Sequence, residues 1–171
     1  MIEPTPALIT QFLERLGQQF ENPASFYIFG GSALILMGGP RNTGDVDFTF
    51  AAASERADEF RVAVRAVATE MGLDVEESQP AEFMPLPSGL EERHRFLGRY
   101  GQVNAYIFDL YSVALMKIDR AFPTDIEDVH FLLRAGLIEL KALEQKLAEI
   151  IGRHDEKLKL QRNFAEMVKD L

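Results

Sequence analysis

An aromatic, β-prone segment at residues 25–29 runs directly into the pair Gly30-Gly31. Aromatic residues favour a strand, and the two glycines predict that this strand ends in a tight turn. The apolar residues 32–37 that follow predict a short helix, which Gly38-Gly39-Pro40 ends. A strand, a glycine turn and a helix in such close succession require an architecture that combines helices with a sheet.

The next predicted strand carries two carboxylates. Residues 45–50 alternate polar and apolar side chains, which is typical of a strand with one buried face. Asp45 and Asp47 therefore project from the same face, where their like charges are costly unless a cation or an arginine compensates them. A partly open set of oxygen ligands predicts Mg²⁺ or Mn²⁺ as that cation. The alternative is a polar strand face that only contacts solvent.

Gly30, Gly31 and Ser32 form the turn between the first of these strands and the short helix. Backbone N–H groups at the start of a helix, with no side chain in the way, form a cradle for a phosphate. The alternative is a tight turn that needs glycine only for its backbone angles. The aspartate pair on the following strand favours the phosphate cradle.

The rest of the sheet-forming part is predicted from apolar spacing and turn residues. A first helix is expected over residues 6–18 with Thr5 as its N-cap, and a second helix is expected between Ser54, as N-cap, and Gly72. Residues 78–89 contain three prolines and predict a flexible loop. Three further strands are expected at residues 73–76, 93–97 and 103–108.

The C-terminal part has a helical pattern throughout. Four helices are expected, at residues 110–121, 124–134, 137–151 and 155–171. The sequence therefore predicts an α+β fold in a single domain over residues 1–171. A mixed sheet of four to five strands with covering helices would occupy residues 1–109, and a helical half would occupy residues 110–171.

Composition excludes several classes of function. The formal net charge of −9 argues against broad DNA or RNA binding, which depends on many Lys and Arg contacts to phosphate. The absence of cysteine excludes disulfides and cysteine zinc sites, and His94, His130 and His154 fall on different predicted elements, which argues against a histidine metal site. Without a signal-like segment or a long apolar run, we expect a cytoplasmic location and no membrane partner.

Residues 29–34 and 41–48 together resemble the signature of the DNA polymerase beta superfamily of nucleotidyltransferases, in which a glycine-serine turn precedes an Asp-x-Asp strand. The chain is similar to nucleotidyltransferase-like toxins of abortive-infection and toxin-antitoxin systems, and to short bacterial proteins of unknown function with the same fold. The resemblance covers residues 27–133. It implies a nucleotidyltransferase-like domain that takes an NTP and transfers a nucleoside monophosphate to a hydroxyl of an RNA, a protein or a small molecule. A tRNA acceptor and a cognate antitoxin are part of what it implies.

The resemblance also assigns roles to individual residues. It implies that Asp45 and Asp47 hold the metal, and that a third carboxylate comes from a neighbouring strand. Asp109 occupies that position, although as the residue before a helix it is equally an N-cap candidate. The implied nucleotide-binding residues are Gly30, Gly31, Ser32, Arg41, Thr43 and Lys117.

A second stretch strengthens the resemblance. In those proteins a helix with Lys and Arg precedes an Arg-Asp-x-x-Asp segment, and here Lys117 and Arg120 precede Asp125 and Asp128, with Thr124 where an arginine often stands. Lys117 would face a nucleotide phosphate, or else pair with Asp128 while its stem covers apolar surface. Thr124 and Glu127 are expected to form a capping box at the start of the next helix, and Asp125 belongs either to the site or to the first turn of that helix, where an acidic residue favours the helix dipole. Arg120, Asp125 and Asp128 are thus secondary site candidates.

Two other functions compete with this interpretation. The first is a non-catalytic nucleotide-binding or protein-interaction module that keeps the fold without turnover. The second is an antibiotic-type nucleotidyltransferase, which predicts a closed pocket for a small acceptor. Metal-dependent consumption of NTP distinguishes an enzyme from a binding module.

Overall fold

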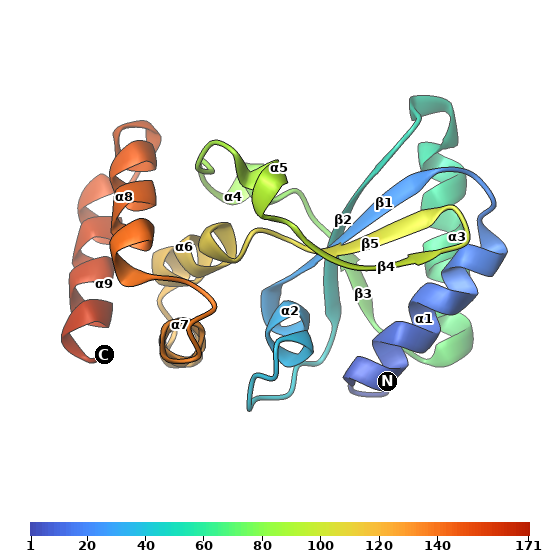
Figure 1. Cartoon of the computed structure of the whole chain (residues 1–171), viewed down its shortest axis with the longest axis horizontal. Coiled ribbons are helices and arrows are strands. Elements are labelled where there is room, and N and C mark those ends of the chain that lie inside the picture. Colours follow the sequence, from blue (N-terminus) through green and yellow to red (C-terminus); the bar gives the residue numbers. More distant parts are fainter. The chain divides into compact units, whose positions relative to one another are not determined.

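A computed structural model describes all 171 residues, which form two compact units (Figure 1). The sheet unit comprises Met1–Ser78 and Arg95–Phe108, and the helical unit comprises Gln79–His94 and Asp109–Leu171. The sequence placed the division at residue 109, and the chain does pass into its C-terminal helices there. Residues 79–94, however, group with the helices rather than with the sheet.

The sheet unit is built around a five-stranded mixed sheet in the order β3-β2-β1-β5-β4. Its strands are β1 (Ala24–Phe29), β2 (Val46–Ala52), β3 (Val75–Glu77), β4 (Arg95–Tyr100) and β5 (Val103–Ile107). The pairs β1–β2 and β4–β5 are antiparallel, whereas β1–β5 and β2–β3 are parallel. Together with the helices, this mixed sheet confirms the predicted α+β class.

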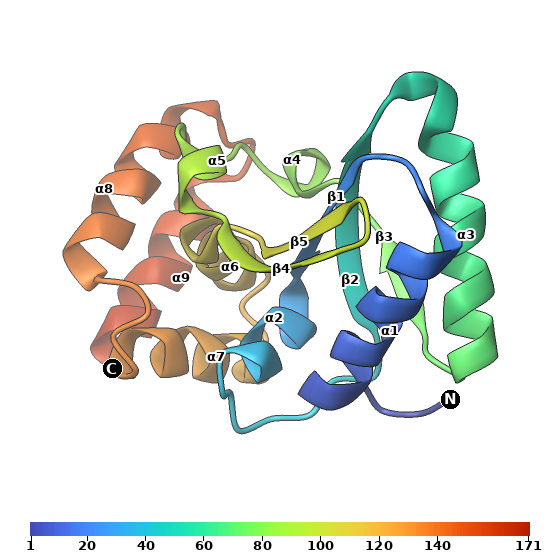
Figure 2. The same ribbon diagram turned by 45° about the vertical axis from the view of Figure 1, so that its right-hand side comes forward.

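Two helices, α1 (Pro6–Gln19) and α3 (Ala57–Met71), pack side by side on one face of the sheet (Figure 2). Strand alternation sends Phe26 and Phe48 to this face, where their rings stack with centroids 4.8 Å apart. Phe12 and Phe60 contribute from the helices to complete an aromatic core. The alternating residues, including Tyr27 and Asp47, project from the opposite face.

The helix boundaries follow local capping chemistry with two corrections. The Thr5 hydroxyl accepts from the Leu8 N–H at 3.2 Å, and Gly72 ends α3 with a left-handed φ of 69°, both as predicted. Ser54, however, begins a 3-10 turn (Ser54–Arg56) and bonds Glu55, so it does not cap α3. The short helix α2 (Gly30–Leu36) begins at the first glycine rather than at Ser32.

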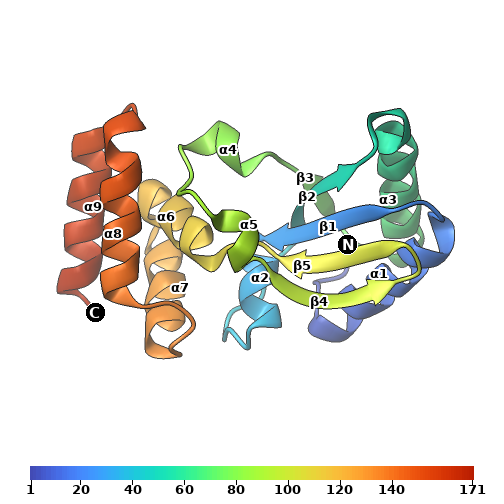
Figure 3. The same cartoon turned by 45° about the horizontal axis from the view of Figure 1, so that its top comes forward.

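The helical unit is arranged around α6 (Leu110–Arg120), which packs against α7 (Pro123–Arg134), α8 (Leu140–Ile150) and α9 (Lys157–Lys169), as Figure 3 shows. A 3-10 turn, Ile151–Arg153, joins α8 to the segment before α9. The buried amide of Asn163 on α9 donates to the carbonyls of Ile118 and Asp119 at 3.0 and 3.2 Å. These carbonyls lie at the end of α6, where no intrahelical donor remains for them.

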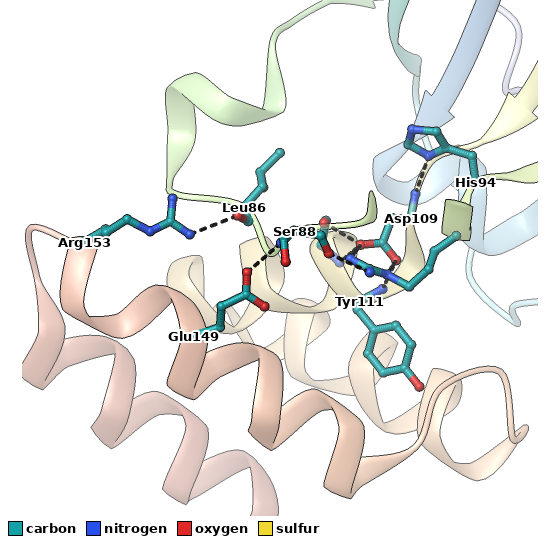
Figure 4. A network of polar contacts seen from close by, with 9 residues as sticks. Leu86, Ser88, His94, Asp109, Tyr111, Glu149 and Arg153 are labelled. Atoms are coloured by element: carbon teal, nitrogen blue, oxygen red, sulfur yellow. Dashed lines mark hydrogen bonds and ion pairs between the residues drawn. The ribbon is translucent and has the colours of Figure 1, made fainter. Parts of the chain in front are cut away.

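Residues 79–94 form two short helices, α4 (Pro80–Phe83) and α5 (Leu90–Arg93), whereas the prolines predicted a flexible loop over residues 78–89. Two hydrogen bonds attach the loop between these two helices to the C-terminal part of the chain (Figure 4). Glu149 accepts from the Ser88 N–H at 2.7 Å, and Arg153 donates to the Leu86 carbonyl at 3.2 Å. No helix of either unit has both the length and the apolar character that a membrane crossing requires.

A close contact between α1 and the β4–β5 turn gives a test of the sheet unit. A methyl group on Gly17 would overlap the carbonyl of Tyr100, which is backbone and cannot rotate away. We expect Gly17→Ala to destabilise the protein by about 1 to 3 kcal/mol, despite the better helix propensity of alanine. Gly152→Ala, whose added methyl group meets nothing within 4 Å, should leave the free energy of unfolding almost unchanged. Chemical denaturation measures both, and equal stabilities would contradict the packing.

Candidate active site

Three carboxylates meet at the β2–β3 side of the sheet. Asp47 lies on β2, Asp45 directly precedes that strand, and Glu76 lies on β3 opposite Asp47 in the parallel register. One oxygen from each carboxylate lies within 4.8 Å of the others. Asp45 and Asp47 are half-buried and Glu76 is exposed, so the group, called here the carboxylate triad, remains accessible from solvent.

Two of the three carboxylates of the triad lack a cationic partner in the protein. Neither Asp45 nor Glu76 has a Lys, Arg or His partner within ion-pair distance, whereas Asp47 takes part in a further polar interaction. Carboxylates this close repel one another unless a proton or a cation intervenes. Only oxygen ligands are present, which matches the preference of Mg²⁺ and Mn²⁺. The residues therefore fit a divalent hard cation.

Glu76 is the member of the triad that sequence reasoning missed. The sequence predicted the strand that carries Glu76, but it did not predict that this strand pairs with the strand of Asp47. The parallel register of β2 and β3 pairs Asp47 with Glu76 across 29 positions of sequence. An acidic residue at the centre of a short strand was the only available signal, and that pattern alone also describes a solvated edge strand.

The glycine turn lies directly against this triad. Gly30 has a φ of 63°, and a side chain there would overlap the carboxylate of Asp47. A methyl group on Gly31 would lie 2.7 Å from the hydroxyl oxygen of Thr43. The two glycines are thus required by the close approach of Asp47 and Thr43 as well as by the backbone angle. This approach brings the turn, the loop before β2 and the triad together in one unit.

The other residues predicted from the turn occupy different environments. Ser32 is fully buried, and its hydroxyl donates to the Phe29 carbonyl at 3.2 Å, so this side chain holds the turn. Arg41 is half-buried and lies, like Thr43, in the loop between α2 and β2. The structure therefore brings Gly30, Gly31 and Thr43 close to the triad, whereas nucleotide contacts of Ser32 and Arg41 stay a prediction.

Asp109 is the N-cap of α6 and is completely buried in the helical unit (Figure 4). Arg93 forms a fork with it, donating Nε to Oδ1 and Nη2 to Oδ2, both at 3.0 Å. The N–H groups of Tyr111 and Ser112 donate to the two oxygens at 3.2 Å, and the Ser112 hydroxyl donates to Oδ2 at 2.7 Å. Both oxygens are therefore engaged within the helical unit, as the capping alternative requires. A metal-ligand role for Asp109 stays a prediction.

His94 completes the surroundings of Asp109. Its Nδ1 accepts the backbone N–H of Asp109 at 3.1 Å, which requires an unprotonated nitrogen. Burial lowers the pKa of His94 and outweighs the opposite effect of the nearby Asp109 carboxylate. A neutral imidazole is thus the form that supports the start of α6.

The second predicted cluster forms a buried ion network in the helical unit. Lys117, only 6% exposed, places its Nζ 2.7 Å from Asp128 Oδ2 and 3.4 Å from Asp125 Oδ1. Arg120 donates Nε and Nη2 to the two oxygens of Asp125 at 2.7 and 2.6 Å. The pairing of Lys117 with Asp128 is the alternative that the sequence left open. It does not by itself decide whether Lys117 also contacts a nucleotide.

Asp125 also explains how α7 begins. Its carboxylate accepts the N–H of Phe122, the N-cap residue, at 3.2 Å. The expected capping box of Thr124 and Glu127 is therefore wrong, because Asp125 supplies the carboxylate instead. Burial raises the pKa of Asp125, but Arg120, Lys117 and this backbone bond outweigh it and hold the pKa below its ordinary value. Because the folded-state pKa is the lower one, Asp125 stabilises the fold above about pH 4, and this contribution is lost as the pH falls through the folded pKa.

The ion network predicts a large cost for removing its lysine. Lys117→Met keeps the bulk of the side chain but leaves two buried carboxylates with one cation fewer, so we expect a loss of about 3 kcal/mol in the free energy of unfolding. The matched control is Lys159→Met, which removes an exposed pair with Glu156 and should cost under about 1 kcal/mol. Urea denaturation compares the two variants, and similar small losses would contradict a structural role for the Lys117 pairs.

Asp109 gives a separate test, because both of its oxygens accept hydrogen bonds. In Asp109→Asn an NH₂ group must face donors from Arg93 or Ser112, so we expect a loss of about 2 to 4 kcal/mol, although asparagine is a good N-cap elsewhere. Asp170→Asn, on an exposed carboxylate, is the control. Differential scanning fluorimetry with and without Mn²⁺ then separates the roles, because a lost Mn²⁺ response at intact stability would identify Asp109 as a ligand.

Comparison with known proteins identifies the family of the chain. The model of a family described as nucleotidyltransferase of unknown function, DUF6036, matches residues 7–170 and therefore spans both units. No curated protein and no solved structure gives a match. Since the family model covers almost the whole chain, the protein belongs to the DUF6036 family of nucleotidyltransferases of unknown function.

Proposed function

We propose that the protein is a divalent-metal-dependent nucleotidyltransferase that moves a nucleoside monophosphate from an NTP to a hydroxyl acceptor. The observation that carries this proposal is the carboxylate triad of Asp45, Asp47 and Glu76 beside the Gly30-Gly31 turn. The turn presents backbone without side chains next to three oxygen ligands, which is the combination a metal-bound triphosphate needs. Membership of a family described as nucleotidyltransferases supports it.

In this proposal each residue has a distinct task. Asp45, Asp47 and Glu76 hold the divalent ion, which when bound neutralises charge on the triphosphate and its leaving group. The Gly30-Gly31 turn lets the phosphates approach the backbone. The acceptor oxygen forms a bond to the α-phosphorus, the bond to the bridging oxygen breaks, and pyrophosphate leaves. The acceptor proton passes to one of the triad's carboxylates, which acts as general base.

Lys117 and Arg41 are proposed to add positive charge for the phosphates, on the strength of the resemblance of their segments to nucleotidyltransferase-like toxins. The same resemblance supports RNA, and tRNA in particular, as the acceptor of a toxin with a cognate antitoxin. Incubation with α-labelled NTPs and total RNA or protein tests the acceptor class, because the label moves to the acceptor. Nucleotide binding without pyrophosphate release in any mixture would instead support the non-catalytic module.

The triad predicts a metal response that depends on its aspartates. In Asp45→Asn with Asp47→Asn, like charges are removed while the shape of both side chains is kept, so the fold should remain intact in the absence of metal. We expect Mn²⁺ or Mg²⁺ to raise the melting temperature of the parent by mass action but not that of the double variant. Pyrophosphate release from a panel of NTPs should fall at least about a hundredfold. An unchanged metal response would refute the site.

The role of Glu76 as a metal ligand is tested by comparison with Asp74, which lies on the same segment outside the triad. Glu76→Gln keeps shape but weakens a ligand, so the Mn²⁺ concentration that gives half of the thermal stabilisation should rise about tenfold or more. Asp74→Asn removes an exposed carboxylate two residues away that lies outside the triad, and it should respond as the parent does. If both variants need the same Mn²⁺ concentration for half of the thermal stabilisation, Glu76 does not hold the ion.

A further inference from the structure

A pocket of about 630 Å³ lies within the helical unit, outside all the residues discussed as the nucleotidyltransferase site. One wall comprises residues of α4, of α5 and of the loop between them, and another comprises the segment that connects α8 to α9. The hydrogen bond from Arg153 to the Leu86 carbonyl connects these two walls (Figure 4). The volume is that of a site for a small organic molecule.

A carboxylate without a cationic partner faces this pocket. Asp119 lines it with a side chain that is 20% exposed, and no Lys or Arg lies within ion-pair distance. Its Oδ1 lies 3.0 Å from Nε2 of His154, which is about 95% buried and also lines the pocket. Neither of these two buried atoms has a hydrogen-bond partner.

His154 cannot easily supply the missing charge. Its Nδ1 accepts the N–H of Glu156 at 2.9 Å, so the ring that makes this bond carries its hydrogen on Nε2 and is neutral. The neutral ring therefore lies beside Asp119 without neutralising its charge. A half-buried carboxylate in this position gains more from an incoming cation than one in open water does.

The remaining lining favours a cation that has an apolar body. Glu82 and Asp155 add negative charge to the pocket, and the one guanidinium there, that of Arg153, donates to the Leu86 carbonyl. Met84 is almost fully buried and forms an apolar wall with Leu90. Phe83 is 60% exposed and offers an aromatic face beside the carboxylates, a surface that attracts ammonium groups.

We propose that this pocket binds a small organic amine, with its ammonium group on Asp119 and its apolar part against Met84, Leu90 and Phe83. The site is separate from the carboxylate triad and does not rest on the proposed transfer activity. The pocket selects for a positive charge through Asp119 and for an apolar body through the side chains of Met84 and Leu90. Inorganic cations lack the apolar body, and neutral analogues lack the charge.

Benzylamine is a suitable probe, and benzyl alcohol is its neutral analogue of nearly equal shape. In ¹H–¹⁵N spectra of the full chain at neutral pH, benzylamine should shift the amides of Met84, Leu90 and His154 in a saturable way. Benzyl alcohol should bind at least about tenfold more weakly. Equal binding of the two compounds, or no saturable shift with benzylamine at millimolar concentration, would overturn the proposal.

Two variants locate the binding. Asp119→Asn keeps the shape beside His154 and should weaken benzylamine at least about tenfold while leaving benzyl alcohol unchanged, whereas Asp170→Asn, on an exposed carboxylate at the end of α9, should bind as the parent does. Ala81→Trp, at an exposed lining position where folding tolerates bulk, should obstruct both compounds. Benzylamine affinity that is the same in Asp119→Asn and Asp170→Asn would place the amine elsewhere and refute the site.

Discussion

The register of the three strands β1, β2 and β3 is the constraint on which the candidate active site depends. Phe29 pairs with Asp47, and Asp47 pairs with Glu76, so the end of β1, the aspartate strand and the edge strand are aligned residue by residue. A slip of one residue would turn Asp47 toward the aromatic core and remove Glu76 from its side. The stacked rings of Phe26 and Phe48 oppose such a slip, because they occupy the alternate positions of the same two strands.

The carboxylate triad differs from the most deeply buried carboxylates of the helical unit. In the helical unit the buried carboxylates have cationic partners: Asp109 has Arg93, Asp125 has Arg120, and Lys117 lies between Asp125 and Asp128. Buried pairs of this kind contribute little net stability compared with apolar packing, but breaking one is costly, so they favour one arrangement of the helices over others. In the carboxylate triad Asp45 and Glu76 have no such partner. The contrast supports a binding role for the triad and a structural role for the paired residues.

Local patterns accounted for most of the fold. Apolar spacing located the long helices, Gly72 marked the end of α3, and the glycine pair marked the end of β1. The sequence could not reveal contacts that depend on long-range pairing. Glu76 needed the register of β2 and β3, and the fork from Arg93 to Asp109 joins residues 16 positions apart. The prolines of residues 78–89 predicted a flexible loop. The sequence could not show that Glu149 and Arg153, far along the chain, form hydrogen bonds with this segment.

The side chain of Asn163 connects the last helix, α9, to the interior of the helical unit. It completes the hydrogen bonding of two carbonyls at the end of α6, the helix that carries Lys117 and Asp119. A chain that stopped before α9 would leave those carbonyls without donors and would uncover the apolar side of α6. The C-terminal helix therefore cannot be trimmed as a tail, and insertions or fusions near it are tolerated only where they leave the amide of Asn163 in place.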